Sequence, residues 1–343
     1  MTRRVKAAPR HWVVYAIGRG ILALAAVVPF GAARWMGRWL GRLGRWPFGI
    51  RRRVVERQIA GAFPGADQAT VRRIARESYG NLGEVMIETA RLPGLGRRGV
   101  LDLFEGEDGF ESIVAAHQAG RGIILITGHF GNWELAGAYV AARGIPIEAV
   151  VRRLNNPLFD RYVTRTREKA GMRVVRDRDA VRRTPRAFRE GHAVAFVADQ
   201  GVLGLASTFV PFFGRPAKTP RGPAVFAMRT RVPTLFVAAV RQPSGRFRCV
   251  VTPVEIPDTG DREADVDMVV ARFTSILESW VRRYPGQYFW HHKRWKLQPH
   301  GTPPDLLDPV MEPQRVESGR GEQGQDRPGR EQPAPANGSG DRP

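Results

Sequence analysis

Short runs of β-branched and aliphatic residues alternate with segments of helical periodicity through the middle of the chain, and this alternation restricts the fold more than any other feature. Five runs predict strands: Gly122–Thr127, Ile147–Val151, Ala193–Ala198, Thr234–Val240 and Arg248–Val254. Helical spacing occurs at 67–91, 108–119, 132–143, 157–171, 179–190, 220–231 and 262–283. Strands that alternate with helices form sheets whose faces the helices cover. The expected fold class is therefore α/β, with a mixed, largely parallel central sheet flanked by helices.

The composition describes a folded and strongly basic protein. Hydrophobic residues make up 43% of the 343 residues, enough for a core, and the formal net charge is +21. The single cysteine, Cys249, excludes a disulfide framework within the chain and any metal site built on several cysteines. The positive charge indicates an anionic partner: a nucleic acid, an anionic membrane surface, or an acidic protein or phosphorylated substrate.

Residues 1–50 are expected to form a basic, tryptophan-rich segment that anchors the protein to a membrane. Residues 12–30 are nearly all apolar and just long enough to span a bilayer, but Arg19 near their middle opposes this, and a buried helix is the alternative. Between 31 and 48, a basic stripe at helical spacing runs beside a tryptophan-rich stripe. The basic residues are Arg34, Arg38, Arg42 and Arg45, and the tryptophans are Trp35, Trp39 and Trp46.

Such a pair of stripes is typical of a helix that lies on an anionic membrane. Gly37, Gly41 and Gly44 lower the intrinsic stability of this helix, so we expect it to become ordered on lipid. Whether the segment spans the bilayer or lies on it is left open by the sequence.

The rest of the chain is expected to hold one catalytic domain, residues 51–300, and a disordered tail, residues 301–343. From 318 onward the only apolar side chains are two alanines, so disorder is expected there. Residues 94–99 match the pattern G-x-G-x-x-G, but they follow no predicted strand and open no helix. We therefore expect a loop at this position and no dinucleotide site.

The strongest local signal is the run Gly128-His129-Phe130-Gly131-Asn132-Trp133-Glu134. It follows a strand of the buried type, and Asn132 is a good N-cap for the helix that follows. His129 is therefore expected at the carboxyl end of a strand, where α/β sheets bind ligands. Glu134 falls in the first helical turn, where its carboxylate could orient the imidazole and fix its tautomer.

This run and several others resemble the lipid A biosynthesis acyltransferases, the late lauroyl and myristoyl transferases of the lysophospholipid acyltransferase superfamily. The superfamily signature H-x4-[DE] corresponds to His129 and Glu134. The resemblance covers roughly residues 50–298. The further matching blocks are Arg53–Val55, Ala62–Pro64, Asn81–Gly83 with Glu88, Asn156-Pro157 with Arg167 and Gly171, Ala198–Gln200, Phe209–Thr219 and Tyr284–Lys296.

The resemblance implies a glycerolipid-acyltransferase-like fold and acyl transfer from a thioester to a hydroxyl of a lipid A precursor. His129 is then the base that removes the hydroxyl proton, and Glu134 orients it. Arg167 is the candidate for binding the oxyanion or an acceptor phosphate. Asp199 ends the strand at 193–198, on the same sheet edge as His129, and would support either the base or a sugar hydroxyl.

The expected partners are acyl carrier protein or acyl-CoA as donor, a phosphorylated glycolipid as acceptor, and an anionic membrane, on the cytoplasmic face of the inner (plasma) membrane. No cofactor is expected, and no metal, because His117, His192, His291 and His292 have no spacing typical of a ligand set. The arginines of residues 152–189 fit either a solvated surface or contact with an acidic carrier or head group.

Two other interpretations stay open. The same chemistry could act on another acceptor, such as a phosphatidylinositol mannoside, with acyl-CoA as the donor. A non-catalytic membrane or nucleic-acid binder would explain the charge but not the run around His129, and no recognised nucleic-acid module is present. Nucleic acid is therefore not expected as a partner.

Overall fold

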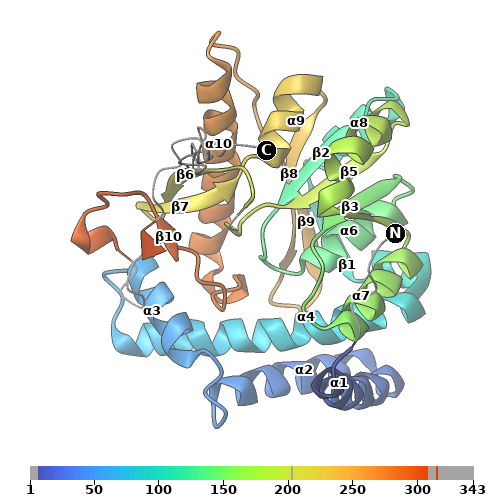
Figure 1. Cartoon of the computed structure of the whole chain (residues 1–343). Helices are drawn as coiled ribbons and strands as arrows, with labels where there is room; N and C mark the ends of the chain where they lie inside the picture. Colours follow the sequence, from blue (N-terminus) through green and yellow to red (C-terminus); the bar gives the residue numbers. More distant parts are fainter. Residues whose placement is uncertain (1–6, 202–203, 308–313, 316–343) are drawn as a thin grey trace, which may run out of the picture.

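A seven-stranded sheet forms the centre of the molecule, whose computed structural model describes residues 7–201, 204–307 and 314–315 (Figure 1). In spatial order the strands are β1 (Phe104–Asp108), β9 (Phe247–Pro253), β8 (Thr234–Arg241), β2 (Ile123–Thr127), β5 (Ala193–Val197), β3 (Ile147–Val151) and β4 (Met172–Arg176). Neighbours are parallel except β8 and β9. The expected mixed, largely parallel sheet is confirmed, and each of the five expected strands lies within one residue of its predicted bounds.

Helices cover both faces of this sheet, as expected. They are α4 (Gln68–Asp102), α5 (Glu111–Gln118), α6 (Trp133–Ala142), α7 (Pro157–Lys169), α8 (Ala180–Arg189), α9 (Gly222–Thr230) and α10 (Arg262–Arg283). Because side chains alternate along a strand, Ile124 and Ile126 of β2 pack in one core with α8, α9 and α10. Ile123 and Leu125 face the opposite core, with α5 and α6.

Polar or proline-containing strands escaped the sequence analysis. The edge strands β1 and β4 carry charged residues on exposed positions, so they lack a continuous apolar run. A separate antiparallel hairpin, β6 (Ser207–Phe212) and β7 (Arg215–Pro220), contains three prolines. The short remaining elements are α3 (Arg52–Ala62), β10 (Leu297–Gln298), β11 (Gln314–Arg315) and the 3-10 turns η1 (Asp177–Asp179), η2 (Pro285–Gln287) and η3 (Pro304–Leu306). Of the tail expected to be disordered, residues 301–307 and 314–315 are described and include η3 and β11, and the others lie outside the described residues.

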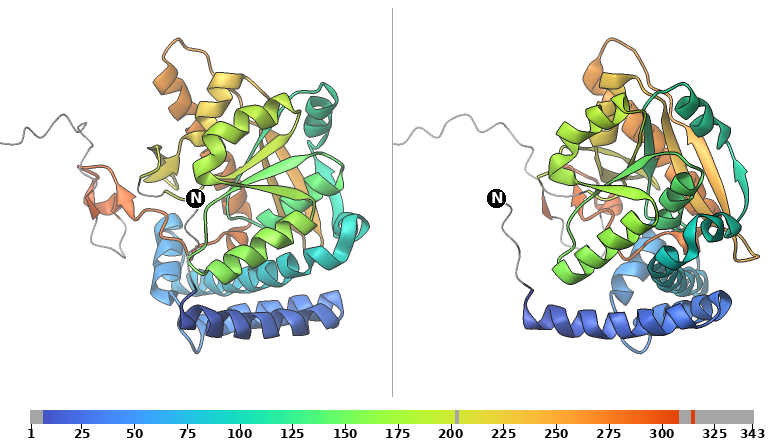
Figure 2. Two further views of the ribbon diagram at one scale, coloured as in Figure 1. Left: turned by 45° about the vertical axis from the view of Figure 1, so that its right-hand side comes forward. Right: turned by 90° about the vertical axis from the view of Figure 1, so that its right-hand side faces the viewer.

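The long helix α4 crosses one end of the molecule, and α1 (Pro9–Val27) and α2 (Phe30–Arg45) form a layer beneath it (Figures 1 and 2). Helix α4 continues beyond its predicted end, with Pro93 inside it and a break at Gly96, where φ is 61°. The G-x-G-x-x-G run therefore lies at a kink of a helix and not in the expected loop. No helix of the described residues is long and apolar enough to cross a membrane.

The glycines of α2 serve close helix packing. A Cβ on Gly83 of α4 would lie 1.9 Å from the carbonyl oxygen of Gly37, and one on Gly41 would lie 2.0 Å from that of Tyr79. The two backbones therefore touch where side chains would otherwise hold them apart. The expectation that these glycines leave α2 without order until it meets lipid is wrong, because α2 is packed against α4 in the structure.

The basic stripe of α2 also faces the protein. Arg34 and Arg38 form ion pairs with Glu84 of α4, at 3.7 and 3.0 Å, and Arg45 pairs with Glu56 at 2.6 Å. Trp35 and Trp39 on the same helix are 65% and 51% exposed. The predicted pairing of a basic and an aromatic surface is thus corrected: the aromatic side chains are exposed, and these arginines bind carboxylates of their own chain.

Candidate active site

His129 lies at the carboxyl end of β2, next to the end of β5, as the sequence predicts. The two strands are parallel, with Thr127 in register with Val197, so the residues just beyond them meet. The imidazole Nδ1 is 2.7 Å from Oδ1 of Asp199, and the backbone N–H of His129 donates to Oδ2 at 3.0 Å. One carboxylate thus holds both the ring and the backbone of His129. The His129 side chain is 23% exposed, so the ring is held at one nitrogen and still open to solvent.

Asp199 is buried and ionised. Burial opposes ionisation, but the charge of His129, the hydrogen bonds from its ring and backbone, and the guanidinium of Arg294 outweigh burial and hold the pKa of Asp199 well below its usual range. The phenol of Tyr288 also interacts with Asp199: burial is the main reason that the pKa of this phenol is raised, and the charge of Asp199 raises it further. The carboxylate is therefore fixed as an anion that accepts hydrogen bonds.

Arg294 is fully buried behind this carboxylate. Its guanidinium donates to the carbonyl of Lys218 and to the hydroxyl of Thr219, both at 2.6 Å. These two bonds hold the cation in the interior, where its charge also acts on Asp199. The supporting roles of Tyr288 and Arg294 escaped the sequence analysis. Their only signal is their place in the run Tyr284–Lys296.

Glu134 contacts a different partner from the one predicted. Its carboxylate accepts hydrogen bonds from Nε and Nη2 of Arg167 at 2.8 and 2.5 Å, in a bidentate ion pair. Because α6 begins at Trp133, Glu134 sits in the first turn and meets the last turn of α7. The expected contact between Glu134 and the imidazole is thus replaced by two pairs, Asp199 with His129 and Glu134 with Arg167.

An apolar cavity of about 50 Å³ opens beside this second pair. Glu134 and Arg167 belong to its lining together with Trp133, Val150, Met172 and Val197. The Trp133 ring also packs edge-on against the His129 ring, with centroids 4.9 Å apart. The candidate site therefore combines an imidazole, an ion pair and an apolar recess along one edge of the sheet.

The backbone around His129 is fixed by a tight turn. Gly131 has φ 60°, and a Cβ there would lie 2.0 Å from the carbonyl oxygen of Ala239, so only glycine fits. Asn132 is the N-cap of α6, as predicted, and accepts a hydrogen bond from the Leu135 N–H at 3.0 Å. The peptide N–H of Phe289 donates to the carbonyl of His129 at 2.9 Å.

One group of possible metal ligands occurs in the described part of the chain: Glu148, Glu190 and His192. Arg183 pairs with both carboxylates, and the imidazole Nδ1 of His192 lies 2.9 Å from Glu148. Because Arg183, Arg173 and Arg186 already pair with the two carboxylates, this group is an ion-pair network and offers a metal no free ligand set.

Residues 152–189 contain twelve arginines, and six of them form close ion pairs with carboxylates of the same chain: Arg167, Arg173, Arg176, Arg178, Arg183 and Arg186. Arg183 and Arg186 pair with Glu190, so they are part of the surface network around β5 and α8. The remaining six are exposed, and of these Arg182 lies 3.9 Å from Asp179: Arg152, Arg153, Arg161, Arg165, Arg182 and Arg189. Arg152 and Arg153 directly follow β3, at the same sheet edge as His129.

Comparison with known proteins gives a consistent result. The sequence model of the bacterial lipid A biosynthesis acyltransferase family matches residues 3–297. The chain is 28% identical over 296 residues to the lipid A biosynthesis palmitoleoyltransferase of Escherichia coli K12, covering 85% of this chain and 94% of that protein. It is 27% identical over 297 residues to the lauroyltransferase of the same organism, covering 86% and 95%.

A relative with another acceptor in its name also matches. The phosphatidylinositol mannoside acyltransferase of Mycobacterium tuberculosis H37Rv is 30% identical over 181 residues, which cover 50% of this chain and 55% of that protein. This match spans a shorter part of the chain than the matches to the Escherichia coli transferases.

Proposed function

Since the chain belongs to the bacterial lipid A biosynthesis acyltransferases and is therefore an acyltransferase, we propose that it moves a fatty acyl chain from acyl carrier protein to a hydroxyl of a phosphorylated lipid A precursor. The family is the one expected from the sequence motifs. The names of the relatives that match over most of their length support lipid A as the end product. Exposed arginines at the sheet edge beside His129 are suited to an acidic carrier protein or an anionic head group.

His129 is the proposed general base. An alcohol is a poor nucleophile at neutral pH, so a positioned base must take its proton as it attacks the thioester carbonyl. With Nδ1–H donated to Asp199, the neutral imidazole has Nε2 free to accept that proton, and the buried carboxylate stabilises the imidazolium that forms. The 2.7 Å contact between His129 and Asp199 is the observation that carries this proposal. We thus transfer the orienting role from Glu134 to Asp199.

Arg167, held in place by Glu134, is proposed to bind a negatively charged group of the reacting substrates. As the thioester carbonyl is attacked, negative charge develops on its oxygen, and a fixed cation lowers the energy of that charge. Glu134 holds Nε and Nη2 of Arg167, which orients the guanidinium beside the apolar recess. Arg167 then binds the oxyanion or an acceptor phosphate. As the tetrahedral intermediate collapses, the thiolate of the donor leaves and takes the proton from the His129 imidazolium.

The enzyme is proposed to work on the cytoplasmic face of the inner membrane. Large apolar side chains are exposed on the layer formed by α1 and α2 and on the turn that follows it: Trp12, Val13, Val14, Ile17, Leu24, Val27, Trp35, Trp39, Trp46, Phe48 and Ile50. Exposed apolar surface of this extent is typical of a site that docks on lipid or protein. A lipid acceptor and these side chains together favour a membrane as the surface.

The test of the proposed chemistry is transfer by His129→Ala. Purified protein is given acyl carrier protein loaded with a labelled acyl chain and a lipid A precursor in mixed micelles, and product is counted by mass. We expect His129→Ala to lose transfer while its circular dichroism and unfolding midpoint stay those of the wild type. The exposed His300 provides the matched control, His300→Ala, with full transfer expected. Transfer at the wild-type rate by His129→Ala refutes the assignment of the base.

The substrates are tested separately, because the mycobacterial relative acts on another acceptor by its name. Acyl carrier protein and acyl-CoA are compared as donors, and a lipid A precursor and a phosphatidylinositol mannoside as acceptors. A higher kcat/KM with the mannoside or with acyl-CoA would replace the proposed substrates and leave the His129 chemistry intact. In the cell, removal of the gene is expected to delete one secondary acyl chain from lipid A, read by mass spectrometry.

A further inference from the structure

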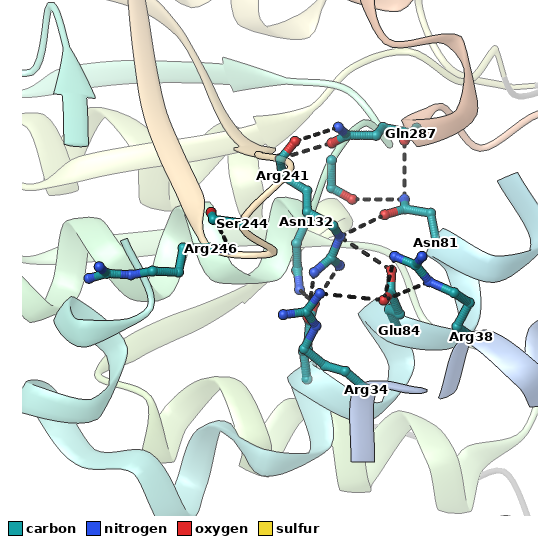
Figure 3. A network of polar contacts seen from close by, with 11 residues as sticks. Arg34, Arg38, Asn81, Glu84, Asn132, Arg241, Ser244, Arg246 and Gln287 are labelled. Carbon is teal, nitrogen blue, oxygen red and sulfur yellow. Dashed lines mark hydrogen bonds and ion pairs between the residues drawn. The ribbon is translucent and has the colours of Figure 1, made fainter. Parts of the chain in front are cut away.

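A network of charged and amide side chains, most of them buried, includes Asn81, Glu84, Asn132 and Arg241 (Figure 3). Its centre is Glu88 of α4, which is 0% exposed. Arg241, at the end of β8, donates Nη1 and Nη2 to the two carboxylate oxygens at 2.6 and 2.8 Å. Asn132 donates its side-chain N–H to the same carboxylate at 2.8 Å. Arg34 of α2 also pairs with Glu88, at 3.4 Å. Glu88 therefore joins α4, β8, α2 and the start of α6, which are distant in sequence.

The contact to Asn132 connects this network to the candidate base. Asn132 uses its amide oxygen to cap α6 and its amide N–H to reach Glu88, so its side chain is fixed at both ends. The residue stands three positions after His129 and two before Glu134, between the two ion pairs of the site. A shift of Asn132 therefore also moves His129 and Glu134, which belong to these two ion pairs.

A second set of contacts holds the same turn from the other side. Gln287 forms two hydrogen bonds with the backbone of Arg241, and its own carbonyl accepts the N–H of Gly131 at 3.0 Å. Asn81 of α4 donates to the carbonyl of Gly131 at 3.2 Å. The turn is thus bound through side chains of α4 and η2 that are themselves tied to Arg241.

We propose that Glu88 is a positioning residue for acyl transfer, which sets the place of the His129 turn by holding Asn132 and Arg241. The inference rests on the proposed role of His129 and adds a residue about which the motif around His129 says nothing. A buried ion pair adds little net stability, because the desolvation of its charges cancels much of their attraction. Hydrophobic residues of similar volume often give the same stability. A charged network with directional bonds does, however, fix geometry, and a misplacement of about 1 Å can lower a catalytic rate about a hundredfold.

Glu84 provides a matched control on the same helix. It is also buried, one turn before Glu88, and it pairs with Arg34, Arg38 and Arg241, the last at 3.3 Å. No hydrogen bond joins Glu84 to Asn132 in the described part of the chain. Glu84→Gln therefore removes a buried charge from the same network, while the hydrogen bond from Asn132 to Glu88 and the two bonds from Arg241 to Glu88 stay in place.

The experiment compares Glu88→Gln with Glu84→Gln in the full-length enzyme. We expect both variants to lower the unfolding midpoint, but only Glu88→Gln to lower kcat by about ten- to a hundredfold, with KM changed less than about threefold. Hydrogen exchange of the peptide covering residues 128–135 is expected to accelerate in Glu88→Gln and not in Glu84→Gln. Equal kcat in the two variants overturns the proposal.

Two further variants test the same link between Glu88 and Asn132 if Glu88→Gln folds poorly. Asn132→Ser retains an N-cap but cannot reach Glu88, and its kcat is expected to fall as in Glu88→Gln. The double variant Glu88→Gln with Asn132→Asp interchanges the amide and the carboxylate of this hydrogen-bonded pair, so the bond and the net charge are kept. Its kcat is expected to be about tenfold higher than that of Glu88→Gln alone. Wild-type kcat in Asn132→Ser refutes the inference. Full transfer by His129→Ala would instead refute the proposed base, whatever the result at Glu88.

Discussion

The substitution Asp199→Asn distinguishes the two carboxylates that the sequence places near His129. Asparagine has nearly the same shape as aspartate, so the substitution removes the charge and leaves the volume. In the wild type, Oδ1 lies 2.7 Å from Nδ1 and Oδ2 accepts the backbone N–H at 3.0 Å. An amide presents an N–H to one of these two positions, so either the ring or the backbone loses its acceptor. The tautomer with the proton on Nδ1 is then no longer favoured, and Nε2 is no longer a free acceptor.

The expected loss in kcat follows from this change. The carboxylate orients the ring, selects its tautomer and stabilises the imidazolium, and removal of such a group in comparable triads costs about 10⁴ in kcat. His129 is partly exposed, so solvent replaces some of the lost stabilisation, and we expect a loss of about 10³ to 10⁴. This corresponds to about 4–5.5 kcal/mol at about 1.4 kcal/mol per factor of ten. Glu134→Gln, which weakens only the hold on Arg167, is expected to cost about ten- to a hundredfold.

Single-turnover transfer from loaded carrier protein measures these losses without interference from product release. The double variant His129→Ala with Asp199→Asn is expected to be no slower than His129→Ala, because the two residues act as one unit. The reverse order, with Asp199→Asn within tenfold of the wild type and Glu134→Gln reduced by 10³ or more, refutes the reasoning. Glu134 would then serve the imidazole during the reaction, as the sequence motif alone predicts.

Two further predictions concern the support of the site and the packing beneath it. Tyr288→Phe deletes a buried hydroxyl that interacts with Asp199, so we expect a free energy of unfolding lower by about 1 kcal/mol in denaturant titration and a kcat reduced by less than about tenfold. An undiminished free energy of unfolding would contradict this interaction. Gly83→Ala places a Cβ 1.9 Å from the carbonyl of Gly37 and is expected to destabilise the protein by about 3 kcal/mol, whereas Gly94→Ala, with open space around its Cβ, is expected to be neutral or slightly stabilising. Equal midpoints for the two alanine variants would refute the close approach of α2 and α4.

The parts of the fold that the sequence predicts are those in which local pattern and tertiary environment agree. The strand Ile123–Thr127 is buried at all five positions, so its apolar run is continuous and easy to recognise. The edge strand Phe104–Asp108 has one buried residue, and its polar positions face solvent, so no periodicity marks it. The bend in α4 at Gly96 is a conformation of one residue, which a repeat of apolar positions does not register.

The site follows the same rule. Placing His129 and Asp199 on one sheet edge requires only the order and direction of strands, which alternation predicts. Which carboxylate meets the ring depends on the direction in which the first turn of α6 points. Arg167, 33 residues after Glu134, competes for that carboxylate, and no local spacing reports such a partner. Local spacing also does not reveal the partners of α2, whose arginines point toward Glu84 and Glu88 of α4, a helix distant in sequence.

The orientation of these arginines toward α4 changes the expected basis of membrane binding. Arg34 and Arg38 are committed to Glu84, so the positive charge available to lipid phosphates on α2 is smaller than its sequence indicates. The exposed parts of Trp35 and Trp39 amount to about 100 Å² each, and complete transfer out of water is worth about 2.5 kcal/mol per side chain at about 25 cal/mol per Å². Immersion to half that extent gives about 2.5 kcal/mol for the pair. We therefore expect apolar contact, more than charge, to hold this layer on lipid.

Binding to vesicles tests this expectation. Trp35→Ala with Trp39→Ala is expected to lower partitioning into vesicles of anionic and zwitterionic lipid by about ten- to a hundredfold, as measured by co-sedimentation. Val181→Ala with Leu205→Ala, which removes exposed apolar groups elsewhere on the molecule, is expected to leave binding unchanged. Because little of the attraction is ionic, an increase in salt from 50 to 500 mM should weaken wild-type binding less than the double tryptophan variant does. Binding that is lost in salt but kept without the two tryptophans would mean that arginines outside α2 provide the contact.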